Sequence, residues 1–143
     1  MRTLVVTLVG VLVLAGCATT PLPASQAKPA PKERIFAFQD KTATNSATAV
    51  VTRDDGFLGS GCYYGFWING VLAARLDVAE TSSFFVEPGE HVLRVGIDPQ
   101  GKGLCSAGSG NWTQRETILR ANEPKFFRLS LDLNGKADIE RSE

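Results

Sequence analysis

Short apolar runs separated by turn residues constrain the fold of this chain more than any other feature. Asn69-Gly70 lies between two such runs and is typical of a tight β-hairpin, because a type I′ turn requires positive φ at both central positions. Glu87-Pro88-Gly89-Glu90 is a second turn signal, in which Pro presets φ and Gly accepts a left-handed conformation. No segment after residue 35 has the period of an amphipathic helix. The pattern predicts an all-β fold, a small antiparallel β-sandwich or open barrel of about seven to nine short strands.

Expected strands can be placed by their apolar content and by the turns between them. They cover residues 35–38, 47–53, 62–68, 71–76, 83–86, 91–97, 113–120, 125–133 and 137–140. In the third of these, alternate residues must point to opposite faces of the sheet. The set that begins at Cys62 and ends at Ile68 contains no Gly, so we expect it to face the core. Tyr63 and Trp67 then point outward.

Residues 1–17 carry the features of a bacterial export signal. Arg2 precedes an apolar stretch, residues 4–14, that is too short to span a membrane, and small residues follow it. Leu14-Ala15-Gly16-Cys17 resembles the lipobox of bacterial lipoproteins at all four positions. An ordinary secretory signal with a chance Cys is the alternative.

The lipobox resemblance implies that residues 1–16 are removed and that Cys17 is lipidated, with acyl chains such as palmitate. Two or three acyl chains give durable anchoring in a membrane, whereas a single chain gives only marginal binding. Ala18 stands where Asp would favour retention in the inner membrane. We therefore expect a protein of the bacterial cell envelope, held in the inner leaflet of the outer membrane and facing the periplasm.

The next segment, residues 18–34, is rich in Pro and Ala. Such a composition cannot build a core and is typical of a semi-extended spacer; a docking role for the Pro-rich run is the alternative. The expected organisation has three parts. They are a signal peptide at 1–16, a lipidated Cys17 with its tether at 17–34, and a β-sandwich domain at 35–143.

Cys62 and Cys105 remain once Cys17 carries lipid. In an oxidising periplasm two such residues usually pair, so we expect a disulfide that joins a Gly-rich loop to the third expected strand. Two free thiols are the alternative. A metal site would need further ligands, and His91 is the only His in the sequence, so we expect no metal.

Aromatic residues are the candidate binding residues. Trp112 lies in a Gly/Ser-rich stretch close to Cys105, and the expected disulfide would bring this stretch toward Tyr63. Tyr63, Trp67 and Trp112 would then form an exposed cluster that stacks on a sugar or a peptide. Alternatively, a second sheet covers this face.

The balance of positive and negative charges bears on whether the chain binds nucleic acid. Lys and Arg total 15, and so do Asp and Glu, which argues against nucleic-acid binding because that normally requires a basic excess. We identify no cofactor motif and no catalytic residues. His91 is the one candidate general base, and a triad would need a nucleophile and an acid beside it.

Residues 66–73 predict a strand, an Asn-Gly hairpin and a return strand, and residues 84–95 predict an aromatic strand, a Pro-Gly turn and a strand that begins with His91. In this order the segment 47–98 resembles the PEGA-type domains of bacterial lipoproteins. Glu87-Pro88-Gly89-Glu90 stands where those domains carry Pro-Glu-Gly-Ala. The resemblance implies a β-sandwich and assigns no functional residues.

Together these features predict a membrane-anchored periplasmic lipoprotein that is not an enzyme. We expect a binding or envelope-assembly module whose partners are the membrane, through the lipid, and other envelope proteins or peptidoglycan. A glycan- or peptidoglycan-binding module that uses Tyr63, Trp67 and Trp112 is the alternative. A small hydrolase that uses His91 with a nearby acid is the third hypothesis.

Overall fold

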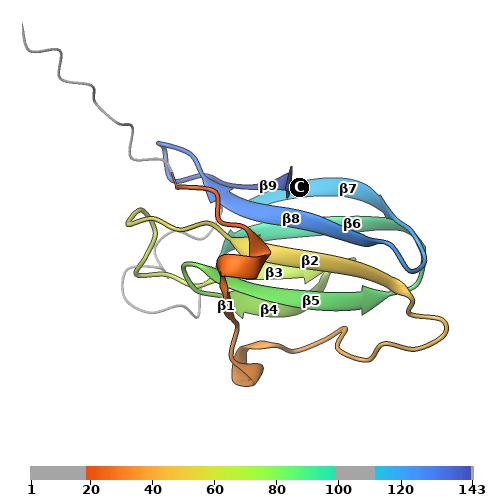
Figure 1. The fold of residues 1–143 in the computed structure, drawn as a ribbon. Coiled ribbons are helices and arrows are strands. Elements are labelled where there is room, and N and C mark those ends of the chain that lie inside the picture. Colours follow the sequence, from red (N-terminus) through yellow and green to blue (C-terminus); the bar gives the residue numbers. More distant parts are fainter. Residues whose placement is uncertain (1–18, 99–111, 143) are drawn as a thin grey trace, which may run out of the picture.

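The computed structural model describes residues 19–98 and 112–142, and there the chain forms two β-sheets packed face to face (Figure 1). One sheet has five strands in the order β1-β5-β2-β8-β9, and the other has four in the order β4-β3-β6-β7. The strands are β1 (Lys28–Pro29), β2 (Ala47–Arg53), β3 (Tyr64–Ile68), β4 (Val71–Leu76), β5 (Glu80–Val86), β6 (Gly89–Ile97), β7 (Trp112–Leu119), β8 (Pro124–Leu131) and β9 (Ala137–Ser142). The predicted all-β sandwich is confirmed.

The predicted strands agree best with the structure where apolar and polar residues alternate and turn residues bound the run. β2 and β4 have the predicted bounds, and Asn69 and Gly70 join β3 to β4 with φ of 50° and 80°, as a type I′ turn requires. The strand predicted at 35–38 is wrong. Ile35 makes only an isolated bridge to Ala74, and Phe38 adopts a left-handed φ of 63° that ends any extended run.

The five-stranded sheet is mixed rather than wholly antiparallel. β2 pairs with β8 in parallel, and β1 pairs with β5 in parallel, while the other strand pairs are antiparallel. Parallel neighbours need a crossover connection. Between β2 and β8 the chain builds the whole four-stranded sheet and β5, so this connection passes through the opposite layer.

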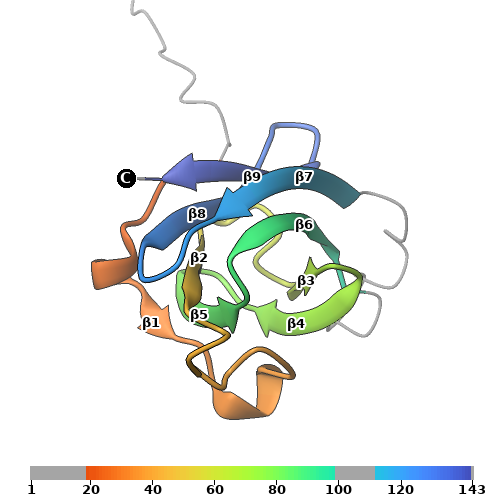
Figure 2. The same cartoon turned by 90° about the vertical axis from the view of Figure 1, so that its right-hand side faces the viewer.

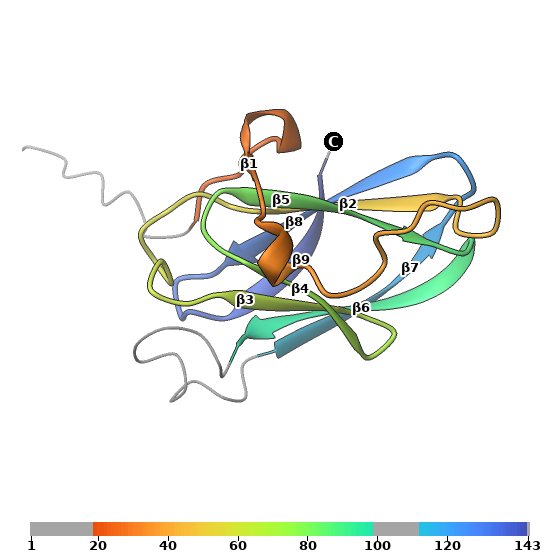
Figure 3. The same cartoon turned by 90° about the horizontal axis from the view of Figure 1, so that it is seen from below.

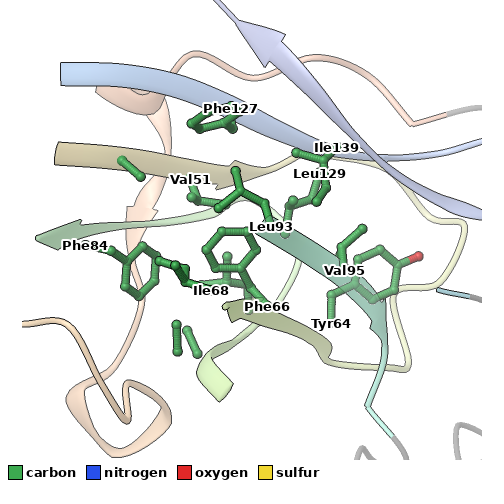
Figure 4. Packing of buried hydrophobic residues seen from close by; sticks show 14 of the residues in the cluster. Val51, Tyr64, Phe66, Ile68, Phe84, Leu93, Val95, Phe127, Leu129 and Ile139 are labelled. Atoms are coloured by element: carbon green, nitrogen blue, oxygen red, sulfur yellow. The ribbon is translucent and has the colours of Figure 1, made fainter. Parts of the chain in front are cut away.

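The core lies between the two sheets (Figure 4). Tyr64, Phe66 and Ile68 are fully buried, which agrees with the expected inward face of this strand. Phe66 packs on Phe84 of the opposite sheet with ring centroids 5.4 Å apart. This contact joins the two layers near the centre of the core.

The described part of the Pro/Ala-rich segment is not a free spacer, and this expectation is wrong for residues 19–34. Two short 3-10 turns, η1 (Ala24–Gln26) and η2 (Lys32–Arg34), lie on either side of β1. Lys28 donates its N–H to the Ala79 carbonyl at 2.8 Å on the five-stranded sheet, and Phe36 donates to the Ala73 carbonyl at 2.8 Å on β4. The segment therefore runs from the edge of one sheet to the edge of the other and closes this side of the sandwich (Figures 2 and 3).

The Pro-rich composition of this segment predicts a spacer, but it does not prevent the segment from packing on a sheet edge. A Pro-rich segment cannot form a core, but Pro is tolerated in an edge strand where its missing N–H faces away from the ladder. An ion pair then holds the segment in place, because the Arg34 guanidinium donates to the two carboxylate oxygens of Glu80 at 2.7 and 2.5 Å. The hydrogen bond that Arg34 donates to Glu80 raises the pKa of Arg34.

Candidate functional site

Two tryptophans and an arginine gather on the outer face of the four-stranded sheet, which is turned away from the core. The register places Trp67 opposite Arg94, and Gly96 between Gly65 and Trp112. The side chains of positions 67, 94 and 112 therefore share this face. We call these three residues the Trp-Arg-Trp cluster.

Within the cluster the arginine lies against both indole rings. The guanidinium carbon of Arg94 is 5.2 Å from the ring centroid of Trp67 and 4.6 Å from that of Trp112, which are cation–π distances. Trp67 is half-buried, and Trp112 is 50% exposed. The cluster thus offers aromatic surface and a positive charge side by side.

Gly65 determines how Trp67 lies. A Cβ atom at Gly65 would come within 2.2 Å of the Trp67 ring, so the indole lies over a position that has no side chain. This close approach needs Gly at 65 rather than any other residue. The absence of a side chain there lets the ring rest on the sheet.

Arg94 differs in its partners from most of the other arginines. Arg34, Arg75, Arg115, Arg120 and Arg128 each contact a carboxylate. In the part of the chain that the structure describes, Arg94 has no carboxylate partner, and its buried Nε atom has no hydrogen-bond acceptor. A guanidinium held by two rings in this way can receive a carboxylate or another anion from outside.

The third predicted aromatic residue lies elsewhere. The Tyr63 ring is half-buried and contacts the guanidinium of Arg34 at 4.6 Å, so a different cation holds it. The structure thus brings Trp67 and Trp112 together through Arg94. Arg94 is not among the binding residues predicted from the sequence, although its position opposite Trp67 follows from the register of β3 and β6.

Cys62 lies just before β3 and is disulfide-bonded. Its expected partner, Cys105, lies outside the described residues, as does the predicted lipidation site, Cys17. The pairing of Cys62 with Cys105 therefore stays a prediction.

Replacing Cys62 by Ser should lower the free energy of unfolding by about 2–5 kcal/mol, the usual loss for a native disulfide. Urea denaturation followed by tryptophan fluorescence measures this loss. Cys105→Ser should cause a similar loss, and the double variant should lose little more than either single variant, because all three remove one bond. Free Cys62 and Cys105 thiols in the oxidised, folded protein would contradict the pairing.

Arg53 is a buried residue that the sequence analysis missed. It is 2% exposed, and its guanidinium donates to three backbone carbonyls, Gly59 at 2.7 Å, Cys62 at 2.6 Å and Leu76 at 3.0 Å. It also lies 3.8 Å from the ring centroid of Tyr64. Burial lowers the pKa of Arg53 and raises the pKa of Tyr64 to about 12. This arginine fastens the loop between β2 and β3 to the core.

His91, the candidate base, has a structural role. Its Nε2 atom donates to the Glu87 carbonyl at 2.8 Å, and its Nδ1 atom accepts from the Asn69 side-chain amide at 3.0 Å. The Val92 N–H donates to the Oδ1 atom of the Asn69 side chain, which fixes the orientation of that amide. The Asn69 NH2 group therefore faces Nδ1 of His91, and the ring proton is on Nε2. Both ring nitrogens are therefore engaged in joining the 69–70 turn to the 87–90 turn.

A hollow of about 830 Å³ lies beside His91 between β6, β7 and β8. Its walls mix acidic and basic side chains, among them Glu116, Glu123, Lys125 and Arg141. No hydroxyl or carboxylate group is bonded to His91 in the described ranges.

Comparison with known proteins assigns neither a family nor a function to this chain. No family model, no curated protein and no solved structure matches the chain. Within residues 19–98 and 112–142, no three metal-ligating side chains form a group, and none of the helical segments could cross a membrane. The likeness to PEGA-type domains stays a prediction.

Proposed function

We propose that this chain is a non-catalytic, lipid-anchored binding module of the bacterial cell envelope, and that it binds cell-wall glycan through the Trp-Arg-Trp cluster. The observation that carries the proposal is the arrangement of Trp67 and Trp112 on either side of Arg94. The lipobox-like residues up to Cys17 support the envelope location.

The chemistry of the cluster fits one class of ligand. The flat, apolar face of a pyranose ring packs on an indole ring, and Trp112 has half of its surface exposed. A guanidinium binds a carboxylate through charge-assisted hydrogen bonds. Peptidoglycan offers both features, since its sugar strands carry peptides with free carboxylates. A ligand that combines a sugar ring with an acidic group would thus use the indole and Arg94 together.

A non-catalytic role agrees with the surroundings of His91. Its two ring nitrogens are bonded to Asn69 and to the Glu87 carbonyl, so neither is available as a general base. The geometry of the cluster also suits binding better than bond cleavage, since the cluster has no carboxylate or nucleophile of its own.

Arg94→Gln and Trp112→Ala should each weaken binding to purified peptidoglycan about tenfold, which corresponds to about 1.4 kcal/mol. Co-sedimentation with isolated sacculi measures the binding. Both variants should stay within about 1 kcal/mol of the wild-type stability, because Trp112 is half exposed and Arg94 forms no ion pair with the other described residues. Binding of the wild-type chain should also weaken at high salt, which screens the charge of Arg94.

Ile118→Ala is the matched control. Ile118 lies on the same strand as Trp112 and is 56% exposed, but it is not part of the cluster. This variant should bind sacculi as the wild type does. Equal binding by all variants, or no sedimentation of the wild-type chain with sacculi, would contradict the glycan proposal and would favour a protein partner.

A further inference from the structure

The first described residues of the chain are held tightly at one end of the sandwich. The Thr19 hydroxyl donates to the Asp54 carboxylate at 3.0 Å and accepts from the Leu131 N–H at 2.9 Å. Thr20 and Asp55 exchange two backbone hydrogen bonds of 2.8 and 3.0 Å. Thr19 therefore joins the loop after β2 to the end of β8.

Asp54 makes this attachment strong. It is 1% exposed and forms an ion pair with Arg128, whose side chain is mostly buried. The hydrogen bond that Arg128 donates to Asp54 raises the pKa of Arg128. Since the Thr19 hydroxyl shares this carboxylate, the start of the folded domain has a fixed position.

Chain length then limits the distance between the domain and the anchor. Two Cα–Cα steps of about 3.8 Å separate Cys17 from Thr19, so these residues are at most about 8 Å apart. If Cys17 carries the lipid, the end of the sandwich that holds Thr19 must lie at the membrane surface. The Pro/Ala-rich residues 19–34 are part of the folded domain and so do not act as a long spacer. Only the two Cα–Cα steps between Cys17 and Thr19 separate a lipid on Cys17 from the domain.

Two exposed apolar side chains flank Thr19 at this end. Phe57 is 94% exposed in the loop between β2 and β3, and Leu133 is 63% exposed in the turn between β8 and β9. Gly56, next to Phe57, packs on Thr19, and Leu133 is two residues beyond Leu131. Figures 1 and 3 show this loop and this turn at the same end of the sandwich.

We propose that this end of the sandwich rests on the bilayer, with Phe57 and Leu133 inserted among the lipid headgroups and the upper acyl chains. Exposed apolar residues beside a lipid anchor add buried apolar area to membrane binding. The proposal rests on the lipid anchor of the proposed function, and it adds a defined orientation of the domain on the membrane.

Arg53 fixes the loop that carries Phe57. Its guanidinium donates to the carbonyls of Gly59 and Cys62 at 2.7 and 2.6 Å, and both residues follow Phe57 in the loop. The loop is thus fastened at both of its ends. A fastened loop presents Phe57 in one direction, so Phe57 and Leu133 together can orient the domain.

A photoreactive residue tests the orientation. Phe57 or Leu133 is replaced by p-benzoylphenylalanine in the full-length protein, which is reconstituted into phosphatidylethanolamine–phosphatidylglycerol vesicles and irradiated. Mass spectrometry then detects phospholipid adducts and, on the same sample, the acyl groups on Cys17. Both replacements are at exposed positions, so folding should be unaffected.

Val71 provides the matched control. It is 50% exposed and follows the Asn69-Gly70 turn at the opposite end of the sandwich. We expect phospholipid adducts at positions 57 and 133, and only background at position 71. An acylated chain without adducts at 57 and 133, or with equal adducts at all three positions, would overturn this orientation and leave the anchor intact. A chain without acyl groups would overturn the anchor itself and this orientation with it.

Discussion

Replacing Arg53 by Met is expected to lower the free energy of unfolding by about 3–5 kcal/mol, because removal of a buried charged donor leaves its partners unsatisfied. Met can fill the space of the aliphatic stem, but the carbonyls of Gly59, Cys62 and Leu76 lose their donor. Urea denaturation followed by tryptophan fluorescence measures the change. The loop between β2 and β3 should also exchange its amide hydrogens faster.

Arg115→Met is the matched control for this prediction. Arg115 pairs with Asp138 at 2.8 Å, but the side chain is 54% exposed, so its loss should cost less than about 1 kcal/mol. Similar losses for the two variants would show that the three carbonyl contacts of Arg53 contribute little to stability.

Replacing Cys17 by Ala should abolish acylation and leave an uncut precursor that retains residues 1–16. The thiol of this residue is the acceptor of the lipid in the lipobox interpretation, so no other position can replace it. Intact-mass measurement of the protein from membrane fractions detects both the retained segment and the missing acyl chains.

Cys62→Ser serves as the control for processing, since Cys62 is disulfide-bonded in the folded domain. It should be cut and acylated as the wild type is. A Cys17→Ala chain that is processed and fractionates like the wild type would disprove the lipobox interpretation.

The regular parts of the fold could be predicted because local rules determine them. β2 and the β3–β4 hairpin follow from period-two alternation and from the Asn69-Gly70 turn. The contribution of residues 28–36 could not be predicted in this way. β1 has only two residues and pairs in parallel with β5, and such a distant partner leaves no periodic pattern in the segment itself.

In the candidate site, too, some features follow from local sequence and others depend on distant parts of the chain. The outward direction of Trp67 follows from alternation within one strand. The role of Arg94 depends on the register between β3 and β6, and that of Arg53 depends on carbonyls from two separate segments, the β2–β3 loop and the end of β4. Pairings between strands and buried polar contacts are set by tertiary structure, which a single sequence does not reveal.

The hydrogen bond between Thr19 and Leu131 bears on the order of events during export. It joins residues 112 positions apart, and such a distant contact forms only after a large loop has closed. If the chain is exported as the lipobox interpretation predicts, the sandwich cannot complete this end until β8 has emerged on the far side of the membrane. Until then Thr19 lacks its bond to Leu131, so a closed domain would not yet hinder the enzymes that would acylate and cut the chain. Acylation and cleavage at Cys17 would then precede folding, and the short distance in sequence between Cys17 and the domain would not prevent them.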